Sequence, residues 1–326
     1  MPEEISLIIC CYNSEHRILP TLEYLSRQKF ERQWELIVVD NNCTDRTIDL
    51  VCASWPQLAD VPLRIVTEER PGHSFARQAG VKSASSELIV FCDDDNWLDP
   101  SYLQNAFLIM SGDKSIGALG GWSKAAFDDD AIVPEWFARA KDGYAVGAQA
   151  NKSGDVSERG YLWGAGLVLR KSLYLIITHP SFPLFLTGRI GQKLTAGDDS
   201  ELCLRLTIIG FKLRYDEELF FHHYIPSSRL TTQYRESLFQ GFEESGRVFE
   251  KYFFFLKHYI NHKNRFLCHL KWNIKYWLML ARAVKRTGSS SQDRMLSLYT
   301  HYQFRGLDVE LRRLVQLSKY AKSELR

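Results

Sequence analysis

The chain has 326 residues, 45% of them hydrophobic, so it can bury a sizeable core and divide into two regions. Its seven cysteines include no Cys-x-x-Cys pair, which argues against a disulfide scaffold or a zinc site and favours reduced thiols in a cytosolic compartment. The net charge of +2 hides an asymmetry, because residues 231–326 hold 18 Lys and Arg against 8 Asp and Glu, whereas residues 1–230 carry a net charge of −8.

This asymmetry defines two predicted regions. Residues 1–230 form an acidic body and residues 231–326 a basic, aromatic-rich tail, so the two are expected to meet different partners. The N-terminus lacks the basic and apolar segments of a signal peptide, and no apolar run approaches the ~20 residues needed to cross a bilayer. We therefore expect a cytoplasmic protein, either soluble or attached peripherally to the inner face of a membrane.

Predicted strands and helices alternate along the first hundred residues. Apolar, β-branched runs predict strands at residues 5–11, 35–40, 63–66 and 87–92, and amphipathic spacing predicts helices at 14–27, at 45–54 and after Ser74. Such alternation is typical of βαβ units and a mostly parallel sheet flanked by helices. Ligands bind at the carboxyl ends of the strands in such sheets, where Asn13, Asp40 and Asp93–Asp95 fall. We therefore expect these residues to share one site.

Three consecutive carboxylates follow the strand at 87–92. Alternate residues of a strand share a face, so Asp93 and Asp95 are expected to point together and Asp94 away from them. Two such carboxylates repel unless a proton or a cation lies between them, and hard oxygen ligands favour Mg²⁺ or Mn²⁺. The alternative is a solvated acidic loop, and Asp128–Asp130 is the same tripeptide without a buried strand before it. The preceding strand, rather than the tripeptide, therefore predicts the metal site.

The second half of the body has fewer regular patterns. Residues 121–160 read as a loop-rich insertion, and a glycine-flanked strand at 167–170 follows Trp163. An amphipathic helix begins at Asp198 and Asp199, and a last strand at 219–224 ends on His222 and His223. The acids at the helix start have a structural alternative, because Asp198-x-x-Glu201 fits a capping box.

Five motifs in this order resemble the family 2 glycosyltransferases of the GT-A fold: Ser6–Asn13, Ile37–Asp45, Ala76–Gly80, Phe91–Trp97 and Gly197–Leu202. The resemblance covers roughly residues 6–224. It implies an α/β fold with a Rossmann-like, mostly parallel sheet flanked by helices, followed by a C-terminal helical region. It also implies transfer of a sugar from a nucleotide diphosphate donor, most simply a UDP-sugar, to a hydroxyl of a glycan or lipid-linked acceptor in surface polysaccharide synthesis.

The resemblance matches Asp95 to the family's metal-ligand acid, Asp93 to the acid nearer the ribose, and Asp40 to the residue that binds the base or ribose. From their chemistry we further expect a metal site completed by Asp93 and by His223 or, as the alternative, His222. The other residues expected at the donor nucleotide are Tyr12, Asn13, Asn42, Arg77 and Asp94, and those expected at the acceptor or sugar are Trp163, Gly164 and Asp198. Asp199 is the expected general base, because a sugar hydroxyl is a poor nucleophile until a carboxylate takes its proton. With a single base, the deprotonated acceptor oxygen would attack opposite the leaving group and invert the anomeric centre. The structural alternatives are a strand-ending Asp40, a solvated Arg77, a hydrogen-bonded His223 and a Trp163 packed in the core.

The tail contains one further predicted helix, at residues 265–286. Its apolar and aromatic side lies beside a basic edge formed by Lys271, Lys275, Arg282 and Arg286. Such a helix would lie on an anionic membrane surface, bind a phosphorylated acceptor, or pack on the body with a solvated basic edge. Nucleic-acid binding is disfavoured, because the body is acidic and contains no recognised motif.

Two other functions compete with the sugar transferase. A nucleotidyltransferase would require a glycine-rich, lysine-bearing phosphate loop after the first strand, and residues 12–17 contain none. A noncatalytic, membrane-associated binding module on a decayed transferase fold is the second alternative. The intact acids Asp93, Asp95 and Asp199 argue against such decay.

Overall fold

The computed structural model describes residues 4–186, 188, 196–258, 274 and 304–325. The chain forms two compact units, Met1–Gly246 and Arg247–Arg326. The first unit contains all the residues that the sequence assigns to a site. The functional division expected after residue 230 stays a prediction.

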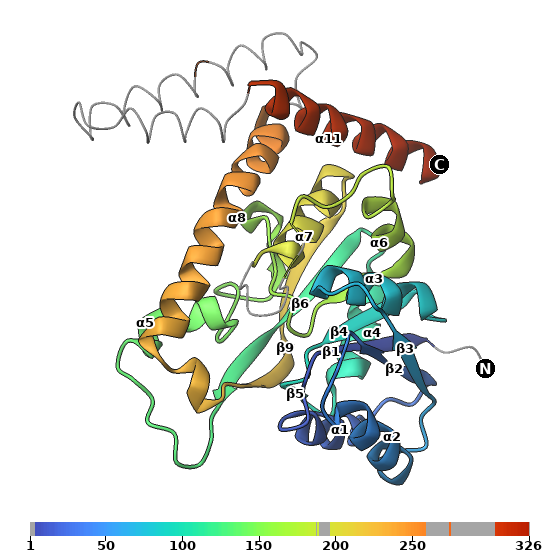
Figure 1. The fold of residues 1–326 in the computed structure, drawn as a ribbon. Coiled ribbons are helices and arrows are strands. Elements are labelled where there is room, and N and C mark those ends of the chain that lie inside the picture. The colour runs from blue at the N-terminus through green and yellow to red at the C-terminus, as the bar shows by residue number, and fades with distance from the viewer. Residues whose placement is uncertain (1–3, 187, 189–195, 259–273, 275–303, 326) are drawn as a thin grey trace. The chain divides into compact units, whose positions relative to one another are not determined.

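One sheet runs through the first unit (Figure 1). Its order is β3 (Leu63–Thr67), β2 (Trp34–Asp40), β1 (Ile5–Cys11), β4 (Leu88–Cys92), β8 (Val168–Arg170), β6 (Ile116–Ala126), β9 (Lys212–Tyr224) and β5 (Asn96–Leu98), with the short β7 (Gly154–Asp155) beside β9. The first four are parallel, β8 is antiparallel to both its neighbours, and β6 and β9 are parallel again. The strands predicted from apolar runs are confirmed.

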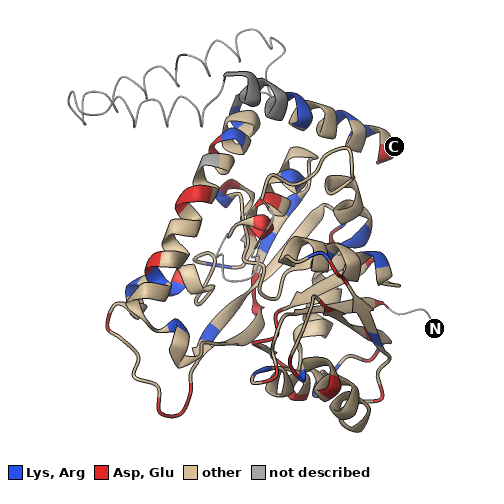
Figure 2. Ribbon diagram, viewed as in Figure 1, with Lys and Arg blue, Asp and Glu red and all other residues tan. Residues whose placement is uncertain are grey.

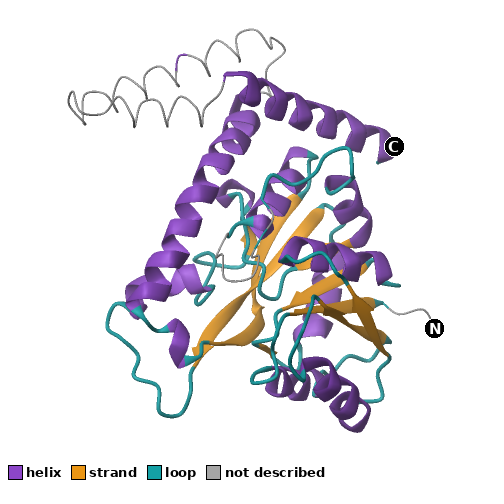
Figure 3. Ribbon diagram, in the orientation of Figure 1, coloured by secondary structure: helices purple, strands orange, loops and turns teal. Residues whose placement is uncertain are grey.

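Helices cover both faces of this sheet, as Figure 3 shows. Alternate strand residues face opposite sides, so Leu7 and Ile9 enter one apolar core and Ile8 the other. The first core receives α1 (Ile18–Ser26), α2 (Thr47–Leu58) and α4 (Tyr102–Gly112); the second receives α3 (His73–Ser83), α6 (Lys171–Ile177) and α7 (Asp198–Ile208). The predicted α/β architecture with flanking helices is therefore confirmed.

The segment at 121–160 is more regular than its sequence indicates. β6 continues through residues 121–126, because it pairs with β9 as far as Tyr224. After it come only short elements, namely α5 (Phe137–Ala140), η1 (Lys141–Tyr144), the strand β7 and η2 (Ser157–Arg159). Phe137 and Tyr144 are buried together with Ile225 and Leu230, so this segment and the residues after β9 form a separate small core.

Most of the described residues after β9 are helical. η3 (Ser227–Arg229) precedes α8 (Thr232–His258), which continues into the second unit, and α11 (Phe304–Glu324) lies near the C-terminus. On α11, Lys and Arg side chains accompany buried Leu314, Leu317 and Ala321 (Figure 2). The helix predicted at 265–286 lies outside the described residues, apart from residue 274. No described helix combines the length and apolar character needed to cross a bilayer.

Candidate active site

The parallel strands β1, β2 and β4 have their carboxyl ends side by side, at the same end of the sheet. Cys11 is level with Asp40 across β1 and β2, and Ile9 is level with Cys92 across β1 and β4. The loops that follow therefore start side by side. Asn13 and Asn42 adopt left-handed backbone conformations, with φ of 52° and 66°, which short polar side chains tolerate better than most.

The polar residues expected at the donor nucleotide brace these loops. Asn13 Oδ1 accepts a hydrogen bond from the Thr44 backbone N–H (2.8 Å), and Asp40 Oδ1 accepts one from the Cys43 N–H (2.8 Å). Asn42 Nδ2 donates to the Glu69 carbonyl (3.1 Å). Tyr12 is half exposed beside them. Asn13, Asp40 and Asn42 thus form a polar rim, in which hydrogen bonds within the loops already hold each side chain in place.

Asn41 is a loop anchor that the sequence analysis missed. Its Nδ2 donates to the carbonyls of Glu68 (2.7 Å) and Arg70 (2.8 Å), and its Oδ1 accepts from the Gly72 N–H (3.0 Å). The side chain thus fastens the loop before α3 to the end of β2. Its place in the run Asp40-Asn41-Asn42 was the only local signal.

The three consecutive aspartates occupy a turn and not a strand, which corrects the expected geometry. β4 ends at Cys92, and the Asn96 N–H donates to the Asp93 carbonyl (3.0 Å) while Asn96 Oδ1 accepts from the Asp93 N–H (3.1 Å). Strand alternation therefore does not set the directions of these side chains. Each carboxylate instead faces a different set of partners.

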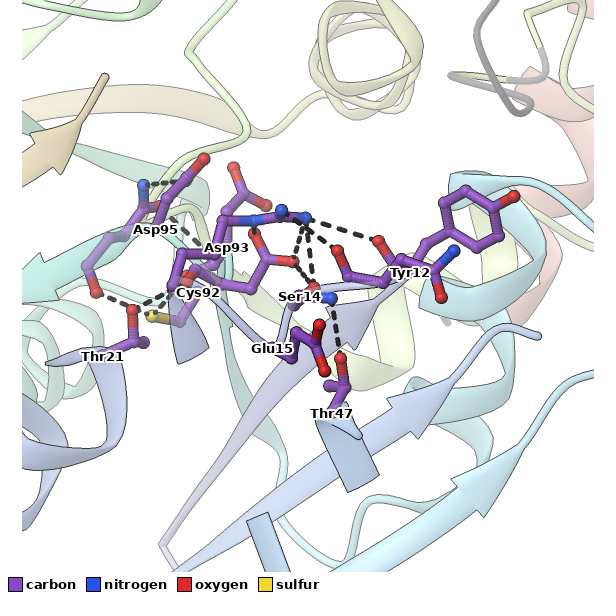
Figure 4. A network of polar contacts seen from close by, with 12 residues as sticks. Tyr12, Ser14, Glu15, Thr21, Thr47, Cys92, Asp93 and Asp95 are labelled. Carbon is purple, nitrogen blue, oxygen red and sulfur yellow. Dashed lines mark hydrogen bonds and ion pairs between the residues drawn. The ribbon is translucent and has the colours of Figure 1, made fainter. Parts of the chain in front are cut away.

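Asp94 points into the protein. Arg17 donates to both of its oxygens, from Nε at 2.8 Å and from Nη2 at 2.9 Å, and the Ser14 hydroxyl also donates to it (Figure 4). Thr21 Oγ1 donates to the backbone carbonyl of Asp94 (2.9 Å). Burial raises the pKa of Asp94 although the Arg17 guanidinium opposes this shift. These contacts favour a structural role for Asp94, and its expected contact with the donor stays untested.

Asp95 faces the end of β9. Arg229 Nη1 lies 2.8 Å from Oδ2, while His223 Nε2 and Asn96 Nδ2 lie 3.4 Å and 3.1 Å from Oδ1. Burial disfavours the ionised carboxylate, but Arg229 and His223 outweigh it and hold the pKa of Asp95 well below its usual range. Arg229 was not expected at this position.

The expected metal ligands fit a cation only in part. Asp95 and His223 lie close enough to share one, and His223 Nδ1 is buried without a hydrogen-bond partner among the described residues. Asp93 faces other partners, and the described part of the chain contains no group of three His, Cys, Asp or Glu side chains arranged around one point. A carboxylate and an imidazole fit a divalent cation that takes its remaining ligands from substrate phosphates and water.

Asp93 and Asp198 face the same pair of basic side chains. Asp198 Oδ2 lies 3.3 Å from both His73 Nδ1 and Arg77 Nη1, and Asp93 Oδ1 lies 3.9 Å from His73 Nε2 and 4.0 Å from Arg77 Nη2. Burial opposes ionisation of Asp198, but the His73 hydrogen bond and Arg77 hold its pKa well below the usual range. The turn after β4 and the start of α7 therefore meet through α3. His73 was not among the expected residues.

Asp199 contacts Gly164, another expected site residue. The N–H groups of Gly164 and Ser200 donate to its two oxygens at 2.6 Å and 2.7 Å. Burial and the neighbouring Asp198 anion raise the pKa of Asp199. A Cβ atom on Gly164 would lie 2.5 Å from Arg77 Nη2 and 3.1 Å from Asp199 Oδ2, so glycine permits this close approach.

The capping-box alternative for Asp198 and Glu201 is wrong. Gly197, and not Asp198, precedes the first turn of α7. Glu201 is fully buried, accepts hydrogen bonds from the N–H groups of Phe185 (2.9 Å) and Leu186 (2.8 Å), and pairs with Arg205 at 3.0 Å. This carboxylate therefore fastens the segment before α7 and leaves Asp198 and Asp199 to the site.

Trp163 lies beside Gly164 and is largely buried. The backbone N–H of Trp163 donates to Gln149 Oε1 (2.8 Å). The Arg159 guanidinium lies 5.7 Å from the centre of the Trp163 ring and 4.3 Å from the centre of the Tyr161 ring. Packing thus accounts for much of the Trp163 surface, and a contact with sugar stays a prediction.

Comparisons with known proteins agree with this arrangement. Residues 6–171, just over half of the chain, match the model of Glycosyl transferase family 2. EpsH of Bacillus subtilis, whose name assigns it to the glycosyltransferases, is 26% identical over 244 residues, which cover 73% of this chain and 65% of EpsH. The dodecaprenyl-phosphate galacturonate synthase of Rhizobium johnstonii is 28% identical over 156 residues, 46% of each protein. The chain thus spans less than two thirds of either relative.

Two solved structures share the fold. A crystal structure of Staphylococcus aureus TarS has a TM-score of 0.50 and 19% identity, covering 68% of this chain and 37% of that one. A crystal structure of GalNAc-T7 with UDP, GalNAc and Mn²⁺ has a TM-score of 0.51 and 11% identity, covering 69% of this chain and 44% of that one. The expected GT-A type of α/β fold is therefore confirmed.

Proposed function

Because the chain belongs to glycosyltransferase family 2, we propose that it moves a sugar from a nucleotide diphosphate donor to an acceptor hydroxyl in the synthesis of a surface glycan. The observation that supports this most directly is the meeting of Asp93, after β4, and Asp198, at the start of α7, on His73 and Arg77. This meeting supports a single site that includes the acids after β4 and the helix start that bears the proposed base.

Asp199 is the proposed general base. The N–H groups of Gly164 and Ser200 orient its carboxylate, and the raised pKa makes the ionised form a stronger proton acceptor than an exposed aspartate. It would take the proton of the acceptor hydroxyl as that oxygen attacks the anomeric carbon and the nucleotide diphosphate leaves. Attack opposite the leaving group inverts the anomeric centre, so we propose an inverting reaction.

Asp95 and His223 are the proposed ligands of Mn²⁺ or Mg²⁺, with Asp93 nearer the ribose. A divalent cation held there would supply positive charge to the leaving diphosphate. GalNAc-T7, which shares the fold, was crystallised with UDP and Mn²⁺. The chain's own contribution is to hold Asp95 ionised, since its pKa lies well below the usual range.

A UDP-sugar is the proposed donor. The exposed ring of Tyr12 is placed to stack on the base, and the polar rim at Asn13, Asp40 and Asn42 offers hydrogen-bonding groups to the base and ribose. Arg77 lies between Asp93 and Asp198, and its planar guanidinium suits the base or the diphosphate.

The proposed acceptor is a glycan or a lipid-linked intermediate, contacted by Trp163, Gly164 and Asp198. The name of the Rhizobium relative includes a polyprenyl phosphate, which supports a lipid-linked acceptor here. Residues 231–326 hold 18 Lys and Arg against 8 Asp and Glu. This positive charge supports a reaction that takes place at the anionic inner face of a membrane.

Release of UDP from candidate UDP-sugars tests this function. With Mn²⁺ present, we expect turnover that is lost on chelation and that falls about 1,000-fold or more in Asp199→Asn, whereas UDP binding measured by calorimetry stays within about threefold of the parent protein. The anomeric configuration of the product, read by NMR, tests inversion. Nucleotide binding without any turnover would contradict the proposal and favour the binding module.

A further inference from the structure

Asp95 has a cationic partner within the chain. Arg229 Nη1 binds its Oδ2 at 2.8 Å, and both side chains are largely removed from water, with 4% of Asp95 and 18% of Arg229 exposed. Asn96 and His223 approach the other oxygen. The guanidinium therefore neutralises the carboxylate to which the proposed function assigns the metal.

The backbone that bears Arg229 is fastened on two sides. The Ser227 N–H and hydroxyl donate to Asp128 Oδ2 at 2.9 Å and 2.7 Å, and the Tyr224 hydroxyl donates to Asp128 Oδ1. Tyr144 donates from its hydroxyl to the Arg229 carbonyl (3.1 Å). The η3 turn is thus held in place, while the long Arg229 side chain can change partner without moving its backbone.

The neighbouring pair, Arg17 with Asp94, has more hydrogen bonds than Arg229 with Asp95. Arg17 binds Asp94 through two nitrogens, and Ser14 adds a third hydrogen bond. Arg229 donates to Asp95 through one nitrogen in the described contacts. A bidentate pair resists exchange better than a single bond, so Arg229 is the arginine suited to leave its carboxylate.

We propose that Arg229 occupies Asp95 in the ligand-free protein and moves to the diphosphate of the donor when a divalent cation binds. This inference rests on the proposed function. A guanidinium and a divalent cation repel each other, so neutralising one buried carboxylate with both is unfavourable. The freed guanidinium has a planar fork that matches phosphate oxygens, and its fixed turn keeps it beside the site.

Mn²⁺ binding to the full chain without nucleotide, measured by calorimetry, tests the competition. Removing the competitor should tighten binding, so Arg229→Gln is expected to bind Mn²⁺ roughly tenfold more tightly than the parent, because a like charge beside the cation is gone. Arg229→Lys, which keeps the charge, should stay close to the parent. Asp95→Asn should abolish the tight binding in both backgrounds.

UDP binding at saturating Mn²⁺ tests the second position of the side chain. Arg229→Gln should bind UDP about tenfold more weakly than the parent, since a charged hydrogen bond to the diphosphate is lost. Opposite changes in the affinities for Mn²⁺ and UDP distinguish this exchange from simple loss of folding, which would weaken both.

Arg214→Gln is the matched control, because Arg214 Nη2 also lies 2.8 Å from a carboxylate, that of Asp216, outside the site. It should change neither the Mn²⁺ affinity nor the UDP affinity.

If Arg229→Gln does not fold, Tyr144→Phe keeps the charge but frees the turn and should tighten Mn²⁺ binding by a smaller factor. Equal Mn²⁺ affinities in a folded Arg229→Gln and the parent, or an unchanged UDP affinity, would overturn the inference. Absence of sugar transfer in the parent, with these affinity changes intact, would instead contradict the proposed function.

Discussion

Two adjacent carboxylates at the start of α7 have opposite tendencies to hold a proton. Asp198 faces His73 and Arg77, which keep it ionised, whereas burial and the Asp198 anion raise the pKa of Asp199. Separation of two neighbouring pKa values in this way is how an enzyme obtains a fixed anion and a proton acceptor from one residue type. The Asp198 charge therefore helps to tune the proposed base.

The pH dependence of the reaction should report this tuning. Asp199 must be ionised to act, so kcat/KM is expected to fall as the pH drops through its raised pKa. In Asp198→Asn the neighbouring anion is gone and the pKa of Asp199 falls, so the acidic limb of the pH profile should move to lower pH. Asp113→Asn, which changes a carboxylate bonded to Ser115 outside the site, should leave the limb in place. A limb that moves upward in Asp198→Asn would count against Asp199 as the base.

Arg17 and Asp94 form a structural pair beneath the candidate site. Loss of the guanidinium in Arg17→Met would leave a buried carboxylate without its cation, so the free energy of unfolding should fall by about 3–5 kcal/mol. Arg32→Met, which breaks the exposed pair with Glu4, should cost no more than about 1 kcal/mol. Urea unfolding measures both values. Similar losses in the two variants would mean that the Arg17 pair does not brace the turn.

At the scale of elements, the start of α7 is positioned from two directions. The Glu201 carboxylate ties the helix to the N–H groups of Phe185 and Leu186, and Gly164 approaches its first turn from the segment before β8. The close approach depends on the missing side chain at Gly164. The helix start is therefore fixed by tertiary contacts rather than by its own caps.

Gly164→Ala should separate activity from folding. The added Cβ would meet Arg77 and Asp199, displacing the proposed base, so kcat is expected to fall on the order of 100-fold while the circular dichroism spectrum is unchanged. Gly112→Ala is the matched control, because a Cβ there would have no heavy atom of the described residues within 4 Å. Its activity should equal that of the parent. Full activity in Gly164→Ala would show that the site does not require this approach.

At the scale of the whole molecule, charge is divided between the ends of the chain. The body carries −8 and residues 231–326 carry +10. A uniform charge would repel or attract an anionic surface as a whole, whereas this division favours attachment through the tail.

Vesicle co-sedimentation tests this attachment. We expect the full chain to bind vesicles that contain phosphatidylserine, to bind neutral phosphatidylcholine vesicles far less, and to be released at about 1 M salt, where the Debye length is only about 3 Å. Equal binding to both kinds of vesicle, or binding that salt does not reverse, would argue against an electrostatic attachment.

The sequence by itself determined the sheet and the approximate place of the site. A continuous apolar run, as in Ile5–Cys11 and Leu88–Cys92, is a local property that predicts a strand buried on both faces, and a carboxyl-end position follows from strand direction alone. The acids after β4 and at the start of α7 were therefore predictable. Their shared resemblance to one family added the hypothesis that they serve a single reaction.

Only the tertiary structure decided which partner each carboxylate has. Arg17, His73 and Arg229 come from loops or helix starts where a basic residue carries no local signal of burial. The tripeptide at Asp93–Asp95 became a turn because Asn96 returns to bond Asp93, and Glu201 became a tertiary anchor because residues 185–186 pass over it. Partner choice depends on packing between segments distant in sequence, and local periodicity contains no information about that packing.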